Sequence, residues 1–170
     1  SNTYERQDSY NKFMDDYYGM FRWVAKLSLD RPEYRIAVMH HASAGNDEIE
    51  DSILINSNVI VLDKDLDSYK TAFSSKCAIT YGSTMGYELN AHGLTTFFID
   101  PGSRCSYLPL KGCDYIDDKK VSSYDDLVTL MSDIVDRGNL PKITQEISDS
   151  FCLSSSDASD RIYNFFINRR

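Results

Sequence analysis

Positive charge is in short supply in this sequence. Its 18 Lys and Arg residues are outnumbered by 26 Asp and Glu residues, which gives a formal net charge of -8. Binding to a nucleic-acid backbone or to an anionic lipid surface depends on clustered Lys and Arg. The composition therefore disfavours both kinds of partner. It leaves room for a phosphorylated small ligand, because a local pocket can oppose the sign of the whole chain.

Long hydrophobic runs are also missing. The longest apolar runs are short, as at 59–62 and 96–99, whereas a membrane-spanning helix needs about 20 apolar residues. The first residues are polar and include Glu5 and Asp8, which is unlike a secretory signal peptide. We therefore expect no transmembrane segment and a cytoplasmic location.

The four cysteines lack the spacing of a metal or redox motif. Cys77, Cys105, Cys113 and Cys152 form no C-x-x-C pair, and a zinc site is not expected without paired ligands. Disulfides are unusual in an acidic α/β chain that lacks a secretion signal. The prediction is four free thiols and no metal.

Strand and helix patterns alternate along the 170 residues, a length typical of one domain. We predict helices over 9–29, 47–55, 67–74, 83–92 and 124–135, followed by two more near the end of the chain. We predict strands over 34–39, 58–62, 77–81, 95–99 and, weakly, 115–116. This alternation predicts an α/β, Rossmann-like three-layer domain with a mainly parallel sheet. Ligands of such folds bind beyond the carboxyl ends of the strands.

Three regions are expected along the chain. Residues 1–30 form an N-terminal helix, residues 31–137 form the Rossmann-like domain, and residues 138–170 form C-terminal helices packed on that domain. One role for the apolar stripe of the first helix is to cover the sheet of its own domain.

The most informative segment is a predicted strand that passes at once into a turn and a helix. Gly82 permits a tight turn, and Ser83 and Thr84 place hydroxyls beside the unpaired amides of the helix start, an arrangement suited to phosphate. Gly86 would let a ligand approach the first turn, and Glu88 could reach the hydroxyls of a ribose. The alternative is a Ser that only caps the helix and an exposed Glu. The segment matches neither the Walker-type phosphate loop nor the G-x-G-x-x-G motif.

Two histidines leave the first predicted strand at its carboxyl end. The imidazoles of His40 and His41 could contact phosphate or transfer a proton near neutral pH. Purely structural hydrogen bonding is the alternative for both.

An acidic run follows the second predicted strand. Asp63, Asp65 and Asp67 contain two D-x-D spacings that could hold a divalent metal, but the EF-hand pattern fails at Ser68 and Ser74. Helix capping and solvation are the favoured roles.

Taken together, several of these motifs resemble the C-terminal, nucleotide-sugar-binding domain of GT-B glycosyltransferases. The resemblance lies in 59–62, 67–69, 77–88 and 93–101, and it extends over about 35–136. The most similar members are bacterial surface and capsular polysaccharide transferases, with UDP-N-acetylglucosamine 2-epimerases as more distant relatives.

The resemblance implies roles for individual residues. Ser83 and Thr84, with Gly82, Gly86 and His41 around them, would bind the donor nucleotide phosphates. Glu88 would bind the ribose, and His40 would match a histidine of capsule transferases that takes part in catalysis. The family often has His-Pro where this chain has His40-His41, and it often has a Pro where this chain has Gly93-Leu94-Thr95.

The resemblance also implies partners. The substrate would be a nucleotide sugar, used without metal or other cofactor, and the saccharide acceptor would bind a separate N-terminal domain. The first helix, residues 1–30, would be a connector between the two halves of a longer protein. The chain alone would then be inactive, and it would lie in the cytoplasm or at the periphery of the inner membrane. The alternatives are a non-catalytic α/β ligand-binding or scaffold module and a UDP-sugar 2-epimerase-like domain.

Overall fold

The computed structural model describes residues 2–40, 47–63, 65–81, 83–102 and 120–138 of the chain. The elements are α1 (Asn2–Asp30), β1 (Ala37–Val38), α2 (Glu48–Leu54), β2 (Ile60–Val61), α3 (Ser68–Phe73), β3 (Ala78–Thr80), α4 (Thr84–Ala91), β4 (Thr96–Ile99), β5 (Lys120–Val121), α6 (Tyr124–Met131) and a π-helical turn, η1 (Ser132–Asp136).

All of the described strand pairs are parallel. β1 pairs with β2, and β4 lies between β3 and β5 in a second sheet. In the second sheet Ile79 is opposite Phe97, and Ile99 is opposite Val121. The predicted α/β class with parallel strands is confirmed, and the arrangement is compatible with a Rossmann-like fold.

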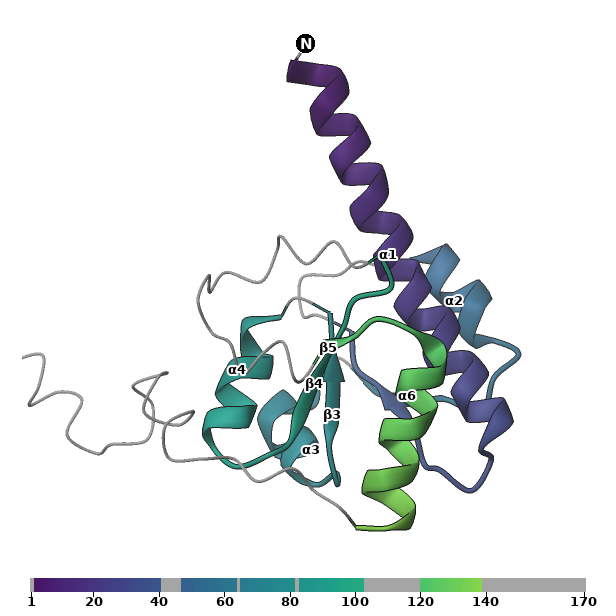
Figure 1. The fold of residues 1–170 in the computed structure, drawn as a ribbon, viewed down its shortest axis with the longest axis vertical. Helices are drawn as coiled ribbons and strands as arrows, with labels where there is room; N and C mark the ends of the chain where they lie inside the picture. The colour runs from purple at the N-terminus through teal and green to yellow at the C-terminus, as the bar shows by residue number, and fades with distance from the viewer. Residues whose placement is uncertain (1, 41–46, 64, 82, 103–119, 139–170) are drawn as a thin grey trace, which may run out of the picture.

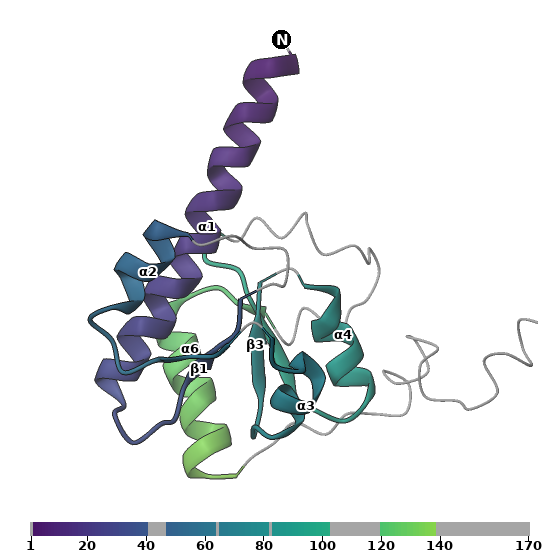
Figure 2. The same cartoon turned by 180° about the vertical axis from the view of Figure 1, so that it is seen from behind.

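Helices cover the strands of the larger sheet on two faces. Figures 1 and 2 show α1 and α6 on one face, and α3 and α4 on the other. Both sheets contribute to the core between α1, α6 and the strands, because Val38 and Val59 pack against the same buried cluster as Ile79. The buried members of this cluster are Val24, Leu27, Tyr34, Phe97, Ile99, Val121, Leu127, Met131 and Ile134.

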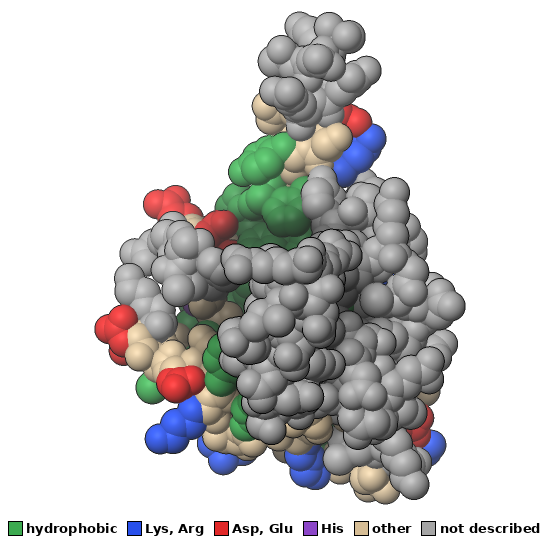
Figure 3. Space-filling model, turned by 90° about the vertical axis from the view of Figure 1, so that its left-hand side faces the viewer, with side chains coloured by type: hydrophobic (Ala, Val, Ile, Leu, Met, Phe, Trp, Pro, Cys, Tyr) green, Lys and Arg blue, Asp and Glu red, His purple; other side chains and the backbone are tan. Residues whose placement is uncertain are grey.

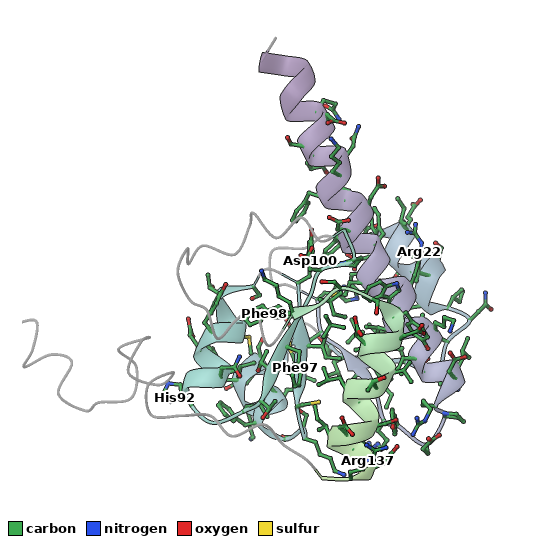
Figure 4. All side chains as sticks on the ribbon, in the orientation of Figure 1. Arg22, His92, Phe97, Phe98, Asp100 and Arg137 are labelled. Carbon is green, nitrogen blue, oxygen red and sulfur yellow. The ribbon has the colours of Figure 1, made fainter. Side chains whose placement is uncertain are left out.

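The central strand β4 supplies both layers of the core. Phe97 packs in the cluster between the sheet and α6, whereas the ring of Phe98 lies 4.9 Å from that of Tyr87 on α4. Adjacent strand residues point to opposite faces, and Figure 4 labels these two phenylalanines on the strand. Because both faces of β4 are covered, all four of its residues are buried.

Most helix ends lie within a residue or two of their predicted positions, although α1 begins at Asn2, seven residues before the predicted start. The carboxylate of Asp47 accepts hydrogen bonds from first-turn amides of α2, and that of Asp67 does the same for α3. α4 ends before Gly93, which has φ +95°, the left-handed conformation that favours glycine at a helix end. α1 ends at Asp30, two residues before Pro32.

Strand burial and strand length differ from the prediction at three places. The β-branched run at 58–62 predicts a buried parallel strand, yet in β2 Ile60 is 45% exposed and Val61 is 50% exposed, and the following helix α3 has no buried residue. β1 is only two residues long within the predicted 34–39. β5 was not predicted: it has a single apolar residue, Val121, and its conformation comes from pairing with β4.

Several predictions fall on residues outside the described ranges. They are the strand at 115–116, the helices beyond residue 138, and the two site residues His41 and Gly82. Among the described residues, no helix is long and apolar enough to cross a membrane.

The first helix has two parts with different surroundings. Phe21, Val24, Ala25 and Leu27 in its second half are buried in the core. The first half projects away from the rest of the protein (Figure 1). The segment between these parts, residues 13–21, lies where the strands end.

Candidate functional site

The ends of three strands meet at residues 13–21 of α1. His40 follows β1, and its ring stacks on Phe21 with centroids 6.1 Å apart. Tyr81 follows β3, and its ring lies 5.4 Å from that of Phe13. Pro101 follows β4, and a Cβ atom on Gly19 would lie 3.3 Å from its Cβ. The carboxyl edge of the parallel strands is therefore bordered by this segment of α1, at the place where ligands of α/β folds bind.

A buried carboxylate holds His40 at this edge. The Nδ1 atom of His40 lies 2.6 Å from Oε2 of Glu50 on α2, and the side chain of Glu50 is 3% exposed. The hydroxyl of Tyr17 donates to the other oxygen, Oε1. A buried carboxylate is costly unless its oxygens are paired. Both oxygens of Glu50 are paired here, by residues from α1 and from the end of β1.

Tyr17 is held as a hydrogen-bond donor. Its burial raises the pKa of the phenol well above its ordinary value, and the hydrogen bond to Glu50 raises it further. Tyr17 therefore stays protonated at every working pH, and its proton points to Glu50. Its ring also lies 6.1 Å from that of Tyr81, so Tyr17 connects the end of β1 with the end of β3.

A second tyrosine–carboxylate pair lies beside the first. The hydroxyl of Tyr18 donates to Oδ2 of Asp47 at 2.9 Å. Desolvation by itself raises the pKa of Asp47, but hydrogen bonds from Tyr18 and from the amides of Glu50 and Ile49, with the charge of His40, lower it overall. Asp47 thus adds a second negative charge close to the imidazole.

The turn after β3 leads into α4 at the same edge. Ser83 is the N-cap residue of α4 with an extended backbone, yet its hydroxyl makes no capping hydrogen bond. Its carbonyl accepts from the amide of Gly86 at 3.0 Å. Thr84, the first residue of the helix, is exposed. The Ser83 hydroxyl is consequently not committed to capping, which was the alternative role for this residue.

Gly86 serves packing, and its predicted role in letting a ligand approach the helix stays a prediction. A Cβ atom at this position would lie 2.7 Å from Cγ2 of Thr80 and 2.9 Å from Cε1 of Phe98. These atoms belong to β3 and β4, so Gly86 faces the sheet and is buried. Its missing side chain lets α4 approach the strands closely.

Glu88 lies two residues after Gly86 on α4, beside α3. Its Oε2 atom accepts a hydrogen bond from the hydroxyl of Tyr69. This contact turns one carboxylate oxygen toward α3. The contact of Glu88 with a ribose stays a prediction. The carboxylate oxygen that Tyr69 leaves for such a contact is Oε1.

The structure connects His40 with the strand that precedes Ser83. His40 and Tyr17 share the carboxylate of Glu50, and the ring of Tyr17 lies beside that of Tyr81, two residues before Ser83. Glu88 has its own partner on α3, and the third histidine of the chain, His92, lies at the opposite end of α4 from Ser83 (Figure 4).

Sequence reasoning missed the partners of His40. Asp47 and Glu50 have the N-cap and N3 spacing of a capping box, in which the acid at N3 turns back to the helix start. Here Asp47 caps the helix, but Glu50 turns to His40 and Tyr17 instead. The spacing alone could have drawn attention to Glu50, although it says nothing of the partner from α1.

Hydrophobic side chains cover the surface next to this edge. The rings of Phe13, Tyr17 and Tyr81 contact one another. Tyr10, one turn before Phe13, is 57% exposed. Figure 3 shows hydrophobic side chains gathered below the projecting part of α1. The edge thus offers aromatic surface beside polar groups.

The remaining candidates have local structural roles. Asp63 accepts from the amide of Asp65 at 3.0 Å, and Asp67 caps α3. Within the described ranges, no three His, Cys, Asp or Glu side chains are grouped to hold a metal ion. Cys77 is a free thiol, and burial raises its pKa to about 11, which keeps it from acting as a thiolate nucleophile. The other three cysteines are outside the described residues.

No family model, curated protein or solved structure matches this chain. The fold itself defines a class, that of mixed α/β proteins with parallel strands.

Proposed function

We propose that this chain binds a nucleotide-sugar donor, as the C-terminal domain of a GT-B glycosyltransferase of surface polysaccharide synthesis. The observation that supports the proposal is that His40, after β1, and Tyr81, two residues before Ser83, both pack against residues 13–21 of α1. This segment borders the carboxyl edge of the strands, which is where α/β folds bind ligands. In this role the first amides of α4, with Ser83 and Thr84, bind phosphate.

The proposed family implies different roles for two domains. This chain supplies the donor side of the cleft, and a second domain supplies the acceptor. The aromatic surface at Phe13 and Tyr81 lies beside the phosphate-binding turn, in a position suited to the rest of the donor or to that second domain.

A second candidate function is an α/β module that binds no nucleotide. It is favoured by two observations: Gly86 is used for packing, and Glu88 is already bonded to Tyr69. Under this alternative the β3–α4 turn is only a connection between elements. The two functions differ in one measurable property, which is affinity for nucleotides.

The first test measures thermal unfolding with UDP, CMP, CDP and GDP at millimolar concentrations. A ligand at ten times its Kd stabilises the native state by about 1.4 kcal/mol, which raises the Tm of a chain of this size by about 3–6 °C. At least one nucleotide is expected to give such a shift. A flat response to all four favours the module without nucleotide.

The role of Glu88 is tested with a matched pair of variants. Glu88→Gln is expected to weaken binding of the ribonucleotide by about tenfold, because a hydrogen bond to a charged group contributes about 1.5–3 kcal/mol. The deoxyribonucleotide should lose less. Tyr69→Phe removes the partner hydroxyl but keeps the carboxylate, so it should preserve affinity. Equal losses for both nucleotides in calorimetry would remove Glu88 from the ribose role.

A further inference from the structure

Glu50 is one of three buried carboxylates near the carboxyl edge in the described part of the chain, with Asp16 and Asp100, and the proposed function leaves it without a role. It comes from α2, while its two partners come from α1 and from the end of β1. Only 2% of the residue is exposed. A buried, paired carboxylate is weak evidence for a role in stability, because apolar residues of similar volume are often at least as stabilising.

We infer that Glu50 is a positioning residue that fixes the tautomer and the orientation of His40, so that Nε2 is the nitrogen presented to a ligand. The distance of 2.6 Å from Nδ1 to Oε2 suits a hydrogen bond in which Nδ1–H donates to the carboxylate. Nδ1 is then occupied, and the imidazole can meet a ligand only through Nε2. This inference rests on the proposed function for the identity of the ligand, and on geometry alone for the state of His40.

Two further contacts restrict the imidazole. Phe21, itself buried, stacks on the ring with an interplanar angle of 18°. Tyr17 occupies Oε1 of Glu50 and leaves Oε2 as the oxygen for His40. The side chain of His40 remains 20% exposed, so the imidazole is not fully enclosed by these contacts.

The chemistry of the presented nitrogen depends on the protonation of the ring. In the neutral imidazole with Nδ1–H, Nε2 carries a lone pair and accepts a proton or a hydrogen bond. In the protonated imidazole, Nε2–H donates, which suits a phosphate oxygen of a nucleoside diphosphate. In both states the hydrogen bond between Nδ1 and Glu50 leaves Nε2 as the nitrogen that meets the ligand. Functional histidines are generally oriented in this way, by a partner on the other ring nitrogen.

The test reads the tautomer of His40 directly. Long-range ¹H–¹⁵N spectra of the 170-residue chain at alkaline pH distinguish protonated from unprotonated ring nitrogens, and His40→Asn identifies the signals. We expect His40 to carry its proton on Nδ1. An Nε2–H form in the wild-type protein overturns the inference, whatever the variants do.

Glu50→Gln should reverse the tautomer. The amide has one oxygen, and the hydroxyl of Tyr17 donates to it, so the amino group faces His40 and Nδ1 must accept. Adding Tyr17→Phe frees the amide oxygen to turn to His40, and it should restore the Nδ1–H form. Glu48→Gln, an exposed carboxylate of the same helix, should leave the spectrum unchanged. A spectrum unaltered by Glu50→Gln overturns the inference.

Binding of UDP separates this inference from the proposed function. At metal sites, loss of a residue that orients a ligating histidine costs about ten- to a hundredfold. By analogy Glu50→Gln is expected to raise the Kd for UDP about tenfold, and Glu48→Gln to leave it unchanged. If the wild-type chain binds neither UDP nor the other three nucleotides, the proposed function fails while the tautomer result stands. If Glu50→Gln reverses the tautomer but leaves the Kd unchanged, the positioning role in binding is refuted.

Discussion

Gly86→Ala is expected to destabilise the protein, although the same change in a helix usually stabilises. The new Cβ would lie 2.7 Å from Cγ2 of Thr80 and 2.9 Å and 3.1 Å from two ring atoms of Phe98. Thr80 has a stiff, β-branched side chain. Phe98 is fully buried and is packed against Tyr87. Neither side chain can move aside without disturbing the core.

Two opposing contributions set the magnitude. Overpacking of a well-packed core costs about 1–3 kcal/mol, and replacing glycine by alanine in a helix contributes up to about 1 kcal/mol. The net loss in the free energy of unfolding is therefore about 1 kcal/mol. Gly86 lies in the first turn of α4, where the gain from helix propensity is smaller, and this moves the balance further toward destabilisation.

The assay is urea unfolding followed by far-UV circular dichroism, with Gly19→Ala as the matched control. At Gly19, in the middle of α1, the nearest atoms to a new Cβ are in Pro101 at 3.3 Å and 3.4 Å, which requires a smaller shift of the neighbour, so this variant should lose less stability than Gly86→Ala. A Gly86→Ala protein that is no less stable than the wild type would refute the packing role. If that protein also lost nucleotide affinity, Gly86 would have a place in the ligand site.

Two other predictions concern buried and capping polar groups. Asn90→Ala should lower the free energy of unfolding in urea by about 2–4 kcal/mol. The fully buried Asn90 bonds both the amide and the carbonyl of Thr96 at 3.0 Å, and each group left unpaired costs about 1–3 kcal/mol. The exposed control Asn56→Ala should be neutral, and equal losses for the two variants would contradict the argument. Asp47→Ala should cost about 1 kcal/mol at pH 7 through loss of the helix cap. The pKa of Asp47 is lowered in the folded state. The stabilisation that Asp47 contributes is therefore present above the unfolded-state pKa of about 3.9 and is lost as pH falls through the folded-state pKa. The difference in unfolding free energy between variant and wild type should shrink from pH 7 to pH 3, and a constant difference would disprove the linkage.

The sequence alone determined the local elements and the class of fold. The ends of α2 and α4 follow from Asp47 and Gly93, because capping and left-handed conformation depend on a few neighbouring residues. The run from Phe97 to Ile99 is buried as expected for a central parallel strand, whereas the apolar run at β2 is half-exposed, so the pattern decided burial only for β4. The alternation of these elements then gave a parallel α/β protein, since connections of this length favour parallel strands.

Only the tertiary structure decided how the chemical groups are paired. Tyr17, His40 and Glu50 are separated by tens of residues, and no local pattern fixes which oxygen of the carboxylate meets which donor. The sequence also does not show that Gly86 faces β3 and β4, where its missing side chain lets the helix pack closely. Such contacts depend on how helices are seated on strands, a property set by the packing of the whole core, and sequence patterns record only which residues are apolar.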